Sequence, residues 1–395
     1  MSVPRSWDVF CHVIDNFGDA AVCWRLARAL AAITPARAEN RAAVRLWIDD
    51  LASLRAMQPE VVLDAARQSV DGVEICHWVD GADFGESADV AVDAFACGLA
   101  DDYAQAMAAR SPKALWIVLE YLSAEPWVEA HHGLPSPHPR LPVERYFFFP
   151  GFGAGAGGLL REPGLGERRE SFLRDARLPQ TFWQDTGFAA PDSGASVISL
   201  FGYENPVVGE LLDTWACGEK AIVAAVPHSR LSADIAAYFD AAIPPAGTSL
   251  RRGALEVRFL PFLTQDRYDQ LLWVADWNFV RGEDSFVRAQ WAERPFVWHI
   301  YPQSGDVQHA KLAAFLELYC GSDRLAEAFA TPLRTLWLEW NDEDRFGAGS
   351  AGRAWSELAR HEGALRRHAH NWARKAAATG DLAINLAKFC QERLK

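Results

Sequence analysis

The segment WDVFCHVIDNFGDAAVCWRLARAL (residues 7–30) runs from an apolar stretch through a polar turn into an amphipathic pattern. Residues 7–14 predict a buried strand. Residues 19–33, with Val22, Leu26 and Leu30 on one face, predict a helix. Because a strand followed closely by a helix is half of a βαβ unit, this segment indicates an α/β fold with a parallel sheet.

The rest of the chain repeats this alternation in two blocks. In the first block, apolar runs predict further strands at residues 44–49, 73–79, 90–95 and 114–121. The second block begins at ASVISLFGYE and predicts helices at 206–217, 231–240, 264–275 and 284–293, alternating with strands at 221–226, 255–262, 277–282 and 295–301. A mostly helical tail follows from Ala351. Together the two blocks predict two facing doubly wound domains.

Residues 122–195 differ from both blocks because they are dense in proline and glycine, as in GLPSPHPRLP (133–142) and PGFGAGAGGLL (150–160). Such a composition predicts loops and a hinge-like connection between domains. We therefore expect residues 1–180 and 181–360 to form the two domains. Residues 361–395 are expected to form helices that pack back on the first domain.

The bulk composition narrows the class of protein. The chain has 395 residues, half of them apolar, and a net charge of −13. That charge argues against nucleic-acid binding, which needs a cationic surface. The seven cysteines are widely spaced without a CxxC pair, which favours reduced thiols. We find neither a signal peptide nor a run of about 20 apolar residues, and so expect a cytoplasmic protein without membrane attachment.

The turn DNFGD (15–19) is the first candidate site, because ligands of parallel α/β sheets bind beyond the carboxyl ends of the strands. Gly18 allows close approach of a ligand, and Asp15 or Asp19 can face it. The alternative is that an aspartate only caps the following helix. A single cap requires one carboxylate, whereas this turn has two.

The segment FVRGEDSFVRAQWA (279–292) is a second strand–turn–helix candidate. Ser285 and the free N–H groups of the helix start can hold a phosphate, with Arg281 and Arg288 adding positive charge. Glu283 can bond a sugar hydroxyl. The alternative is a capped helix with solvated charges.

Aromatic residues lie at two further strand ends. Phe201 and Tyr203 follow one predicted strand, and Phe262 and Gln265 follow another. Rings and an amide suit the face and the edge of a nucleobase, although core aromatics and a turn explain the same pattern. The histidines at 131, 132 and 138 lack the companion ligands of a metal site.

The long motifs VIDNFGDAAVCWRLARAL, RGEDSFVRAQWA and FLPFLTQDRYDQLLW closely resemble the EarP family of protein-arginine rhamnosyltransferases, in matching order. The resemblance implies a GT-B glycosyltransferase with two Rossmann-like domains, the first binding the acceptor and the second the donor. It implies transfer of L-rhamnose from dTDP-β-L-rhamnose to an arginine of elongation factor P, with inversion at the sugar carbon. The resemblance further implies that this modification activates the factor to rescue ribosomes stalled at polyproline. No cofactor and no metal are implied.

The resemblance also implies roles for particular residues. Asp19 is expected to be the catalytic base, with Asp15 a second essential carboxylate. Donor contacts are expected at a further set of positions, of which Glu283 is also assigned to catalysis: Asn16, Phe17, Gly18, Phe201, Tyr203, Phe262, Gln265, Arg281, Glu283, Asp284 and Ser285. The proline-rich loop 133–142 is a candidate surface for elongation factor P.

The implied chemistry explains the paired aspartates. A guanidinium is a poor nucleophile because its pKa exceeds about 12. A hydrogen-bonded carboxylate can orient one nitrogen and accept its proton as the C–N bond forms. Two other functions stay open at this point: a nucleotide-sugar epimerase or hydrolase of the same fold, and a non-catalytic protein that binds a translation factor.

Overall fold

A computed structural model describes residues 4–15, 17–35, 43–302, 307–322, 324–342 and 345–394. The chain divides into two compact units. Unit 1 comprises residues 1–163 and 375–395, and unit 2 comprises residues 164–374.

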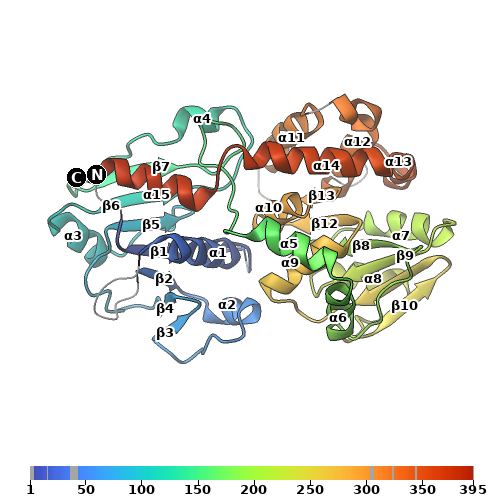
Figure 1. The fold of residues 1–395 in the computed structure, drawn as a ribbon, viewed down its shortest axis with the longest axis horizontal. Coiled ribbons are helices and arrows are strands. Elements are labelled where there is room, and N and C mark those ends of the chain that lie inside the picture. The colour runs from blue at the N-terminus through green and yellow to red at the C-terminus, as the bar shows by residue number, and fades with distance from the viewer. Residues whose placement is uncertain are drawn as a thin grey trace. The chain divides into compact units, whose positions relative to one another are not determined.

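Unit 1 is built on a parallel-dominated sheet (Figure 1). The strand order is β3-β4-β2-β1-β5-β6-β7, and among the described residues every pairing of these strands is parallel except that of β3 with β4. Its elements are β1 (Trp7–Cys11), α1 (Gly18–Ile33), β2 (Val44–Ile48), α2 (Leu51–Met57), β3 (Arg67–Val70), β4 (Val73–His77), β5 (Val90–Ala94), α3 (Asp101–Ala109), β6 (Leu115–Leu119), α4 (Trp127–His131), β7 (Glu144–Phe148) and α15 (Leu382–Arg393).

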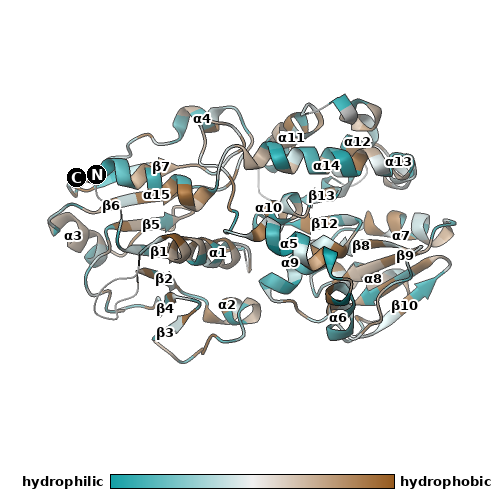
Figure 2. Cartoon of the chain, in the orientation of Figure 1, coloured by the Kyte–Doolittle hydropathy of each residue, from teal (hydrophilic) through white to brown (hydrophobic). Residues whose placement is uncertain are grey.

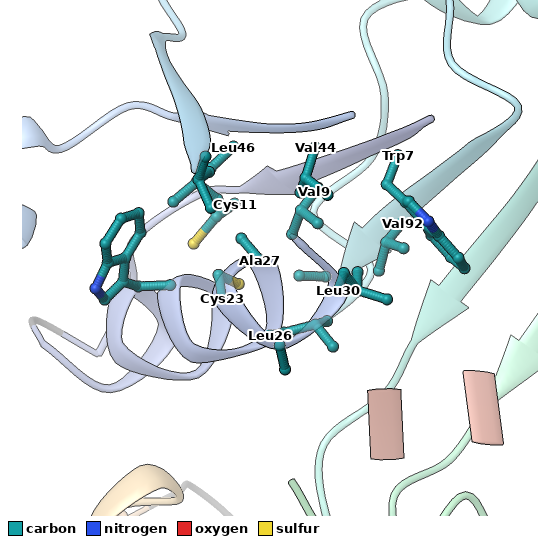
Figure 3. Close-up of a cluster of buried hydrophobic side chains, with 14 of the residues drawn as sticks. Trp7, Val9, Cys11, Cys23, Leu26, Ala27, Leu30, Val44, Leu46 and Val92 are labelled. Carbon is teal, nitrogen blue, oxygen red and sulfur yellow. The ribbon is translucent and has the colours of Figure 1, made fainter. Parts of the chain in front are cut away.

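The core of unit 1 joins α1 to the sheet. Leu26, Ala27 and Leu30 of α1 pack against Val9 of β1 and its neighbours in β2 and β5, as Figure 3 shows. These apolar positions recur at the helical period, and every residue from Asp19 to Ala27 is buried, so this part of α1 is enclosed on all sides. Truncating a side chain as fully buried as Leu30 costs about 2–5 kcal/mol of stability.

Unit 2 has a second sheet of the same kind, with the strand order β10-β11-β9-β8-β12-β13. Only β10 pairs antiparallel, with β11, among the pairings of this sheet in the described residues. Its elements are α5 (Leu165–Arg174), α6 (Arg177–Asp185), β8 (Ser196–Leu200), α7 (Val208–Cys217), β9 (Ile222–Val226), α8 (Leu231–Tyr238), β10 (Ser249–Arg252), β11 (Leu255–Phe259), α9 (Gln265–Val274), β12 (Trp277–Arg281), α10 (Asp284–Trp291), β13 (Phe296–His299), α11 (Val307–Cys320), η1 (Arg324–Ala328), α12 (Ala330–Asn341), α13 (Ser350–Ala359) and α14 (Glu362–Ala377).

The hydropathy of the helices agrees with their different degrees of burial. Figure 2 shows α1 largely brown, as expected of a helix that packs on a sheet, whereas α14 is largely teal. The predicted α/β class, with two doubly wound sheets and a helical tail, is confirmed. Among the described residues, no helix has both the length and the apolar character needed to cross a membrane.

The prediction of loops and a hinge-like connection for residues 122–195 omits several elements, although the division between the two units, at 163/164, falls in this segment. The segment contains α4, β7, α5 and α6. Strand β7 was not predicted because it lies between a proline-rich and a glycine-rich stretch. It pairs in parallel with β6, and the loop before it folds back so that Ser136 N–H donates to the Arg145 carbonyl at 2.7 Å.

The division of the chain also differs from the expected boundaries at 180 and 360. Helix α5 belongs to unit 2, where Phe172 packs edge-on against Trp273 of α9. The tail is shared between the units. In unit 2, Trp372 of α14 donates to Gln290 of α10 at 2.8 Å. In unit 1, α15 returns to the core beside α1 through Leu386 and its neighbours.

Candidate functional site

The first candidate site lies in unit 1, at the carboxyl ends of β1, β5 and β6, which are adjacent in the sheet. The turn between β1 and α1 starts at this edge. His12 Nδ1 and Val13 N–H both bond the Asp49 carboxylate, at 2.9 and 3.0 Å. The beginning of the turn is thereby tied to the end of β2.

Asp19 is 3% exposed and its carboxylate is fixed by hydrogen bonds. Oδ2 accepts from the N–H groups of Ile14 and Asp15, at 2.9 and 3.0 Å. Oδ1 accepts from the hydroxyl of Tyr121 at 3.3 Å. Asp19 therefore organises the turn that precedes α1, whereas an ordinary cap accepts from the first N–H groups of its own helix.

Gly18 leaves room for the second carboxylate of the turn. A Cβ at position 18 would lie 2.7 Å from Oδ2 of Asp15, closer than an ordinary contact. The Gly18 N–H donates to the Asp15 carbonyl at 2.6 Å. The structure thus places Asp15 in the turn and Asp19 at the start of α1, with Asp19 buried and Asp15 half-buried. Phe17 packs partly on the core of unit 1, and Asn16 lies outside the described residues.

Two aromatic residues next to this turn were not predicted. Tyr121 follows β6 and Phe95 follows β5, and their rings stack at 4.3 Å. Phe95 and Ala96 have φ angles of 59° and 55°, which non-glycine residues rarely adopt. Phe95 and Tyr121 are the last residues of the predicted strands 90–95 and 114–121. Examining strand ends for side chains with a polar group could therefore have found Tyr121.

Asp93 is a further buried carboxylate near this edge, and it has a structural role. It accepts from the Gly98 N–H at 2.8 Å and from Trp116 Nε1 at 3.1 Å. Burial raises its pKa, against the effect of these hydrogen bonds. Asp93 therefore holds the turn that carries Phe95.

The second candidate site lies in unit 2, beyond the neighbouring strands β8 and β12. Arg281 at the end of β12 is buried between aromatic rings. Its Cζ lies 4.9 Å from the ring centre of Phe201 and 4.8 Å from that of Tyr203. Nη1 also donates to the Tyr203 hydroxyl at 3.2 Å. The predicted aromatic pair is thus assembled, and it holds a cation.

The start of α10 lies beside this cation. Ser285 accepts from the Arg281 N–H at 3.0 Å, and its hydroxyl donates to the Arg281 carbonyl. That hydroxyl proton is already used within the protein, so any anion at this helix start meets backbone N–H groups instead. Glu283 precedes α10 without a side-chain capping bond, and it is half-buried like Asp284.

Arg288 does not have the role considered for it from the sequence. It is 2% exposed and forms a bidentate pair with Asp269 of α9, with Nε–Oδ1 at 2.9 Å and Nη2–Oδ2 at 2.6 Å. Its charge is thus paired with a buried carboxylate and is not solvated. The pair joins α9 to α10 and is part of the scaffold.

The other predicted donor residues lie beyond β11. Phe262 is 36% exposed, and Gln265 is buried as the first residue of α9, next to the capping residue Thr264. Tyr268 of α9, which was not predicted, packs at 5.3 Å from Phe201. Helix α9 therefore links the segment with Gln265 to the cluster around Arg281.

His299 was also missed. It ends β13 with 6% exposure and lies 5.1 Å from Tyr203, ring to ring. Burial, and then the nearby Arg281 cation, lower its pKa to about 4. It is therefore neutral at pH 7 and adds no charge beside Arg281.

The histidines of the proline-rich region bond the backbone. Nδ1 of His132 accepts from the Phe149 N–H at 3.1 Å, and Nδ1 of His138 accepts from the Leu141 N–H at 3.0 Å. Within the described ranges, no three His, Cys, Asp or Glu side chains gather as metal ligands.

Comparison with known proteins identifies the family. The model of the family described as "Elongation-Factor P (EF-P) rhamnosyltransferase EarP" matches residues 7–391. A protein-arginine rhamnosyltransferase of Pseudomonas putida is 44% identical, covering 99% of this chain and all of the relative. Another, of Pseudomonas aeruginosa, is 45% identical over 97% of this chain and 98% of its own length.

A solved structure agrees with these relatives. It is described as the structural basis for EarP-mediated arginine glycosylation of translation elongation factor EF-P. The two chains are 34% identical with a TM-score of 0.68, covering 98% of this chain and 99% of the other. The predicted GT-B class, with two Rossmann-like domains, is confirmed. The protein is a glycosyltransferase, and the chain belongs to the EarP family of elongation-factor P rhamnosyltransferases.

Proposed function

We propose that the protein transfers L-rhamnose from dTDP-β-L-rhamnose to an arginine side chain of elongation factor P, with inversion at the anomeric carbon. The observation that carries the proposal is the carboxylate of Asp19, which is buried and fixed by three hydrogen bonds at the edge of a Rossmann-like sheet. The names of the relatives support both the sugar and the arginine. Because the acceptor is a translation factor, the proposal also places the enzyme in the cytoplasm.

Asp19 acts in this proposal as the general base. A guanidinium nitrogen attacks the anomeric carbon and forms the C–N bond, while the bond from that carbon to the diphosphate oxygen breaks. The nitrogen loses a proton to the Asp19 carboxylate, so the products are N-rhamnosyl arginine and dTDP. Asp15, in the same turn, balances the charge of the incoming guanidinium. Three fixed hydrogen bonds mean that Asp19 needs little reorganisation during this step.

Unit 2 binds the donor in this proposal. Phe201, Tyr203, Phe262 and Gln265 contact the nucleotide, and Glu283, Asp284 and the α10 start contact the sugar diphosphate. No metal is required because charge on the leaving diphosphate can be met by the N–H groups of α10 and by Arg281. Arg281 is suited to this task since its aromatic neighbours hold the guanidinium in place.

An assay of the purified protein tests the proposal. Elongation factor P and dTDP-β-L-rhamnose are incubated with the protein, and the factor is weighed as an intact protein by mass spectrometry. The proposal predicts a gain of one deoxyhexose, located on an arginine by fragmentation. Release of free rhamnose without a change in the factor would instead indicate a hydrolase. No gain, under conditions in which the Pseudomonas aeruginosa relative works, would contradict the proposal.

A further inference from the structure

The two carboxylate oxygens of Asp19 are not equivalent. Oδ2 receives two backbone N–H groups, from Ile14 and Asp15, and so has both of its lone-pair directions occupied. Oδ1 receives the hydroxyl of Tyr121 at 3.3 Å, and no other described residue donates to it. Within the described part of the chain, one lone-pair direction of Oδ1 therefore remains, and Tyr121 determines which direction it is.

Tyr121 is itself held in place. Its ring stacks on that of Phe95 with a centroid distance of 4.3 Å and an interplanar angle of 15°. The Phe95 N–H donates to the Leu119 carbonyl, two residues before Tyr121, at 2.6 Å. The ends of β5 and β6 are thereby fixed to each other next to Asp19.

The backbone at Phe95 has an unfavourable conformation that other contacts must stabilise. Phe95 and the following Ala96 both have left-handed φ angles, a conformation that costs free energy without glycine. Asp93 holds the same turn through the Gly98 N–H and is itself buried at 1% exposure. A costly backbone conformation and a buried acid therefore support the ring that positions Tyr121.

We propose that Tyr121 is a positioning residue for the transfer reaction, and that Phe95 acts through it. The Tyr121 hydroxyl holds Oδ1 of Asp19 so that its remaining lone pair is presented to the acceptor guanidinium. This inference rests on the proposed function, in which Asp19 is the base. It goes further by assigning the proton-accepting oxygen and the two residues that orient it.

The test compares Tyr121→Phe with wild type under steady-state conditions. The variant keeps the ring stack and loses only the hydroxyl. The melting temperature should therefore stay within about 2 °C of wild type and the KM for elongation factor P within about twofold, as expected of a group acting in the transition state. Since a hydrogen bond to a charged group is involved, we expect kcat to fall about tenfold. The matched control is Tyr146→Phe, in β7 of the same sheet, where the hydroxyl lies 3.5 Å from Glu144. The control should match wild type in all three values.

A second variant tests whether Phe95 acts through Tyr121. Phe95→Leu should lower kcat by a similar factor, because the ring that holds Tyr121 is lost. In the double variant with Tyr121→Phe, the two effects should not multiply, since Phe95 acts only through the hydroxyl. Multiplicative effects would overturn the role of Phe95.

The outcomes separate this inference from the proposed function. An unchanged kcat in Tyr121→Phe, while Asp19→Asn is inactive, would overturn the inference alone. A loss of melting temperature in Tyr121→Phe that accounts for the loss of activity would also overturn it, since the hydroxyl would then be structural. Activity in Asp19→Asn equal to wild type would overturn the proposed base, and with it the inference.

Discussion

Replacing Gly18 by alanine should separate stability from activity in the turn between β1 and α1. The added Cβ would lie 2.7 Å from Oδ2 and 3.3 Å from Cγ of Asp15. To reach an ordinary contact of 3.4 Å, that carboxylate oxygen must move by about 0.7 Å (3.4 − 2.7). The obstacle is the end of a side chain and not backbone, so the turn itself can persist.

The two expected effects have opposite signs. Alanine is a better helix residue than glycine by about 0.5–1 kcal/mol, so Gly18→Ala should leave the melting temperature unchanged or raise it by a few degrees. Displacing a catalytic carboxylate by a fraction of an ångström to an ångström can cost roughly a hundredfold in rate. Since Asp15 assists the base in the proposal, we expect kcat/KM to fall about 10- to 100-fold.

The assay is rhamnosylation of elongation factor P, followed by intact mass, next to thermal unfolding of the same samples. The matched control is Gly209→Ala near the start of α7, where a Cβ meets no atom within 4 Å. The control should gain similar stability and keep full activity. If Gly18→Ala were as active as the control, the position of the Asp15 carboxylate would be irrelevant to the reaction. A melting temperature several degrees below wild type would also refute the reasoning, because the turn would then be disrupted.

Two further predictions concern the scaffold of unit 2. Because burial lowers the pKa of His299 from 6.5 to about 4, the unfolded chain binds the proton first as the pH falls. Wild type should lose up to about 1.4 kcal/mol of unfolding free energy per pH unit between pH 6.5 and 4. His299→Gln should lose less when urea unfolding at pH 7 and 5.5 is compared. An equal change of unfolding free energy with pH in the two proteins would contradict this. Arg288→Met should cost about 3–5 kcal/mol, because it removes the cation that forms a bidentate pair with the buried Asp269 carboxylate, and adding Asp269→Leu should restore most of the melting temperature. An unchanged melting temperature in the single variant would show that the pair is not structural.

The strands near the candidate sites could be predicted from the sequence because their burial creates a clear pattern. Strand β1 is buried at all five positions, and the apolar residues Val22, Leu26 and Leu30 recur at the helical period in the buried part of α1. The short edge strands β3 (RQSV) and β10 (SLRR) carry mostly polar residues and give no such signal. Helix α5 (LGERRESFLR) was missed for the same reason, since few of its side chains are buried.

Contacts between distant segments could not be predicted in the same way. The turn with Asp15 and Asp19 was found because it follows one strand directly. Tyr121 is 102 residues from Asp19, and the two meet only because β5 and β6 follow β1 in the sheet. That strand order is a property of the tertiary fold and is not visible in local patterns.

The misassignment of Arg288 has a similar cause. Its partner Asp269 lies 19 residues earlier, on another helix, and no spacing rule links the two. A sequence pattern shows that a cation follows a helix start, but it does not show whether a buried acid already neutralises the charge. Arg281, by contrast, was placed correctly at the end of its strand. Its contacts with the rings of Phe201 and Tyr203 arise only in the folded unit, so the sequence pattern did not show them.

The role of Asp19 as the base is tested most directly by a single-turnover measurement. Asp19→Asn is mixed with elongation factor P and saturating dTDP-β-L-rhamnose, and the rhamnosylated factor is quantified over time, after donor affinity and melting temperature have been compared with wild type. Asp50→Asn, which alters a carboxylate that caps α2, serves as the control and should react like wild type. The account predicts that Asp19→Asn binds the donor normally and forms product at least 100-fold more slowly, as is typical when an acid–base group is removed. Product formation by Asp19→Asn at the rate of wild type would contradict it.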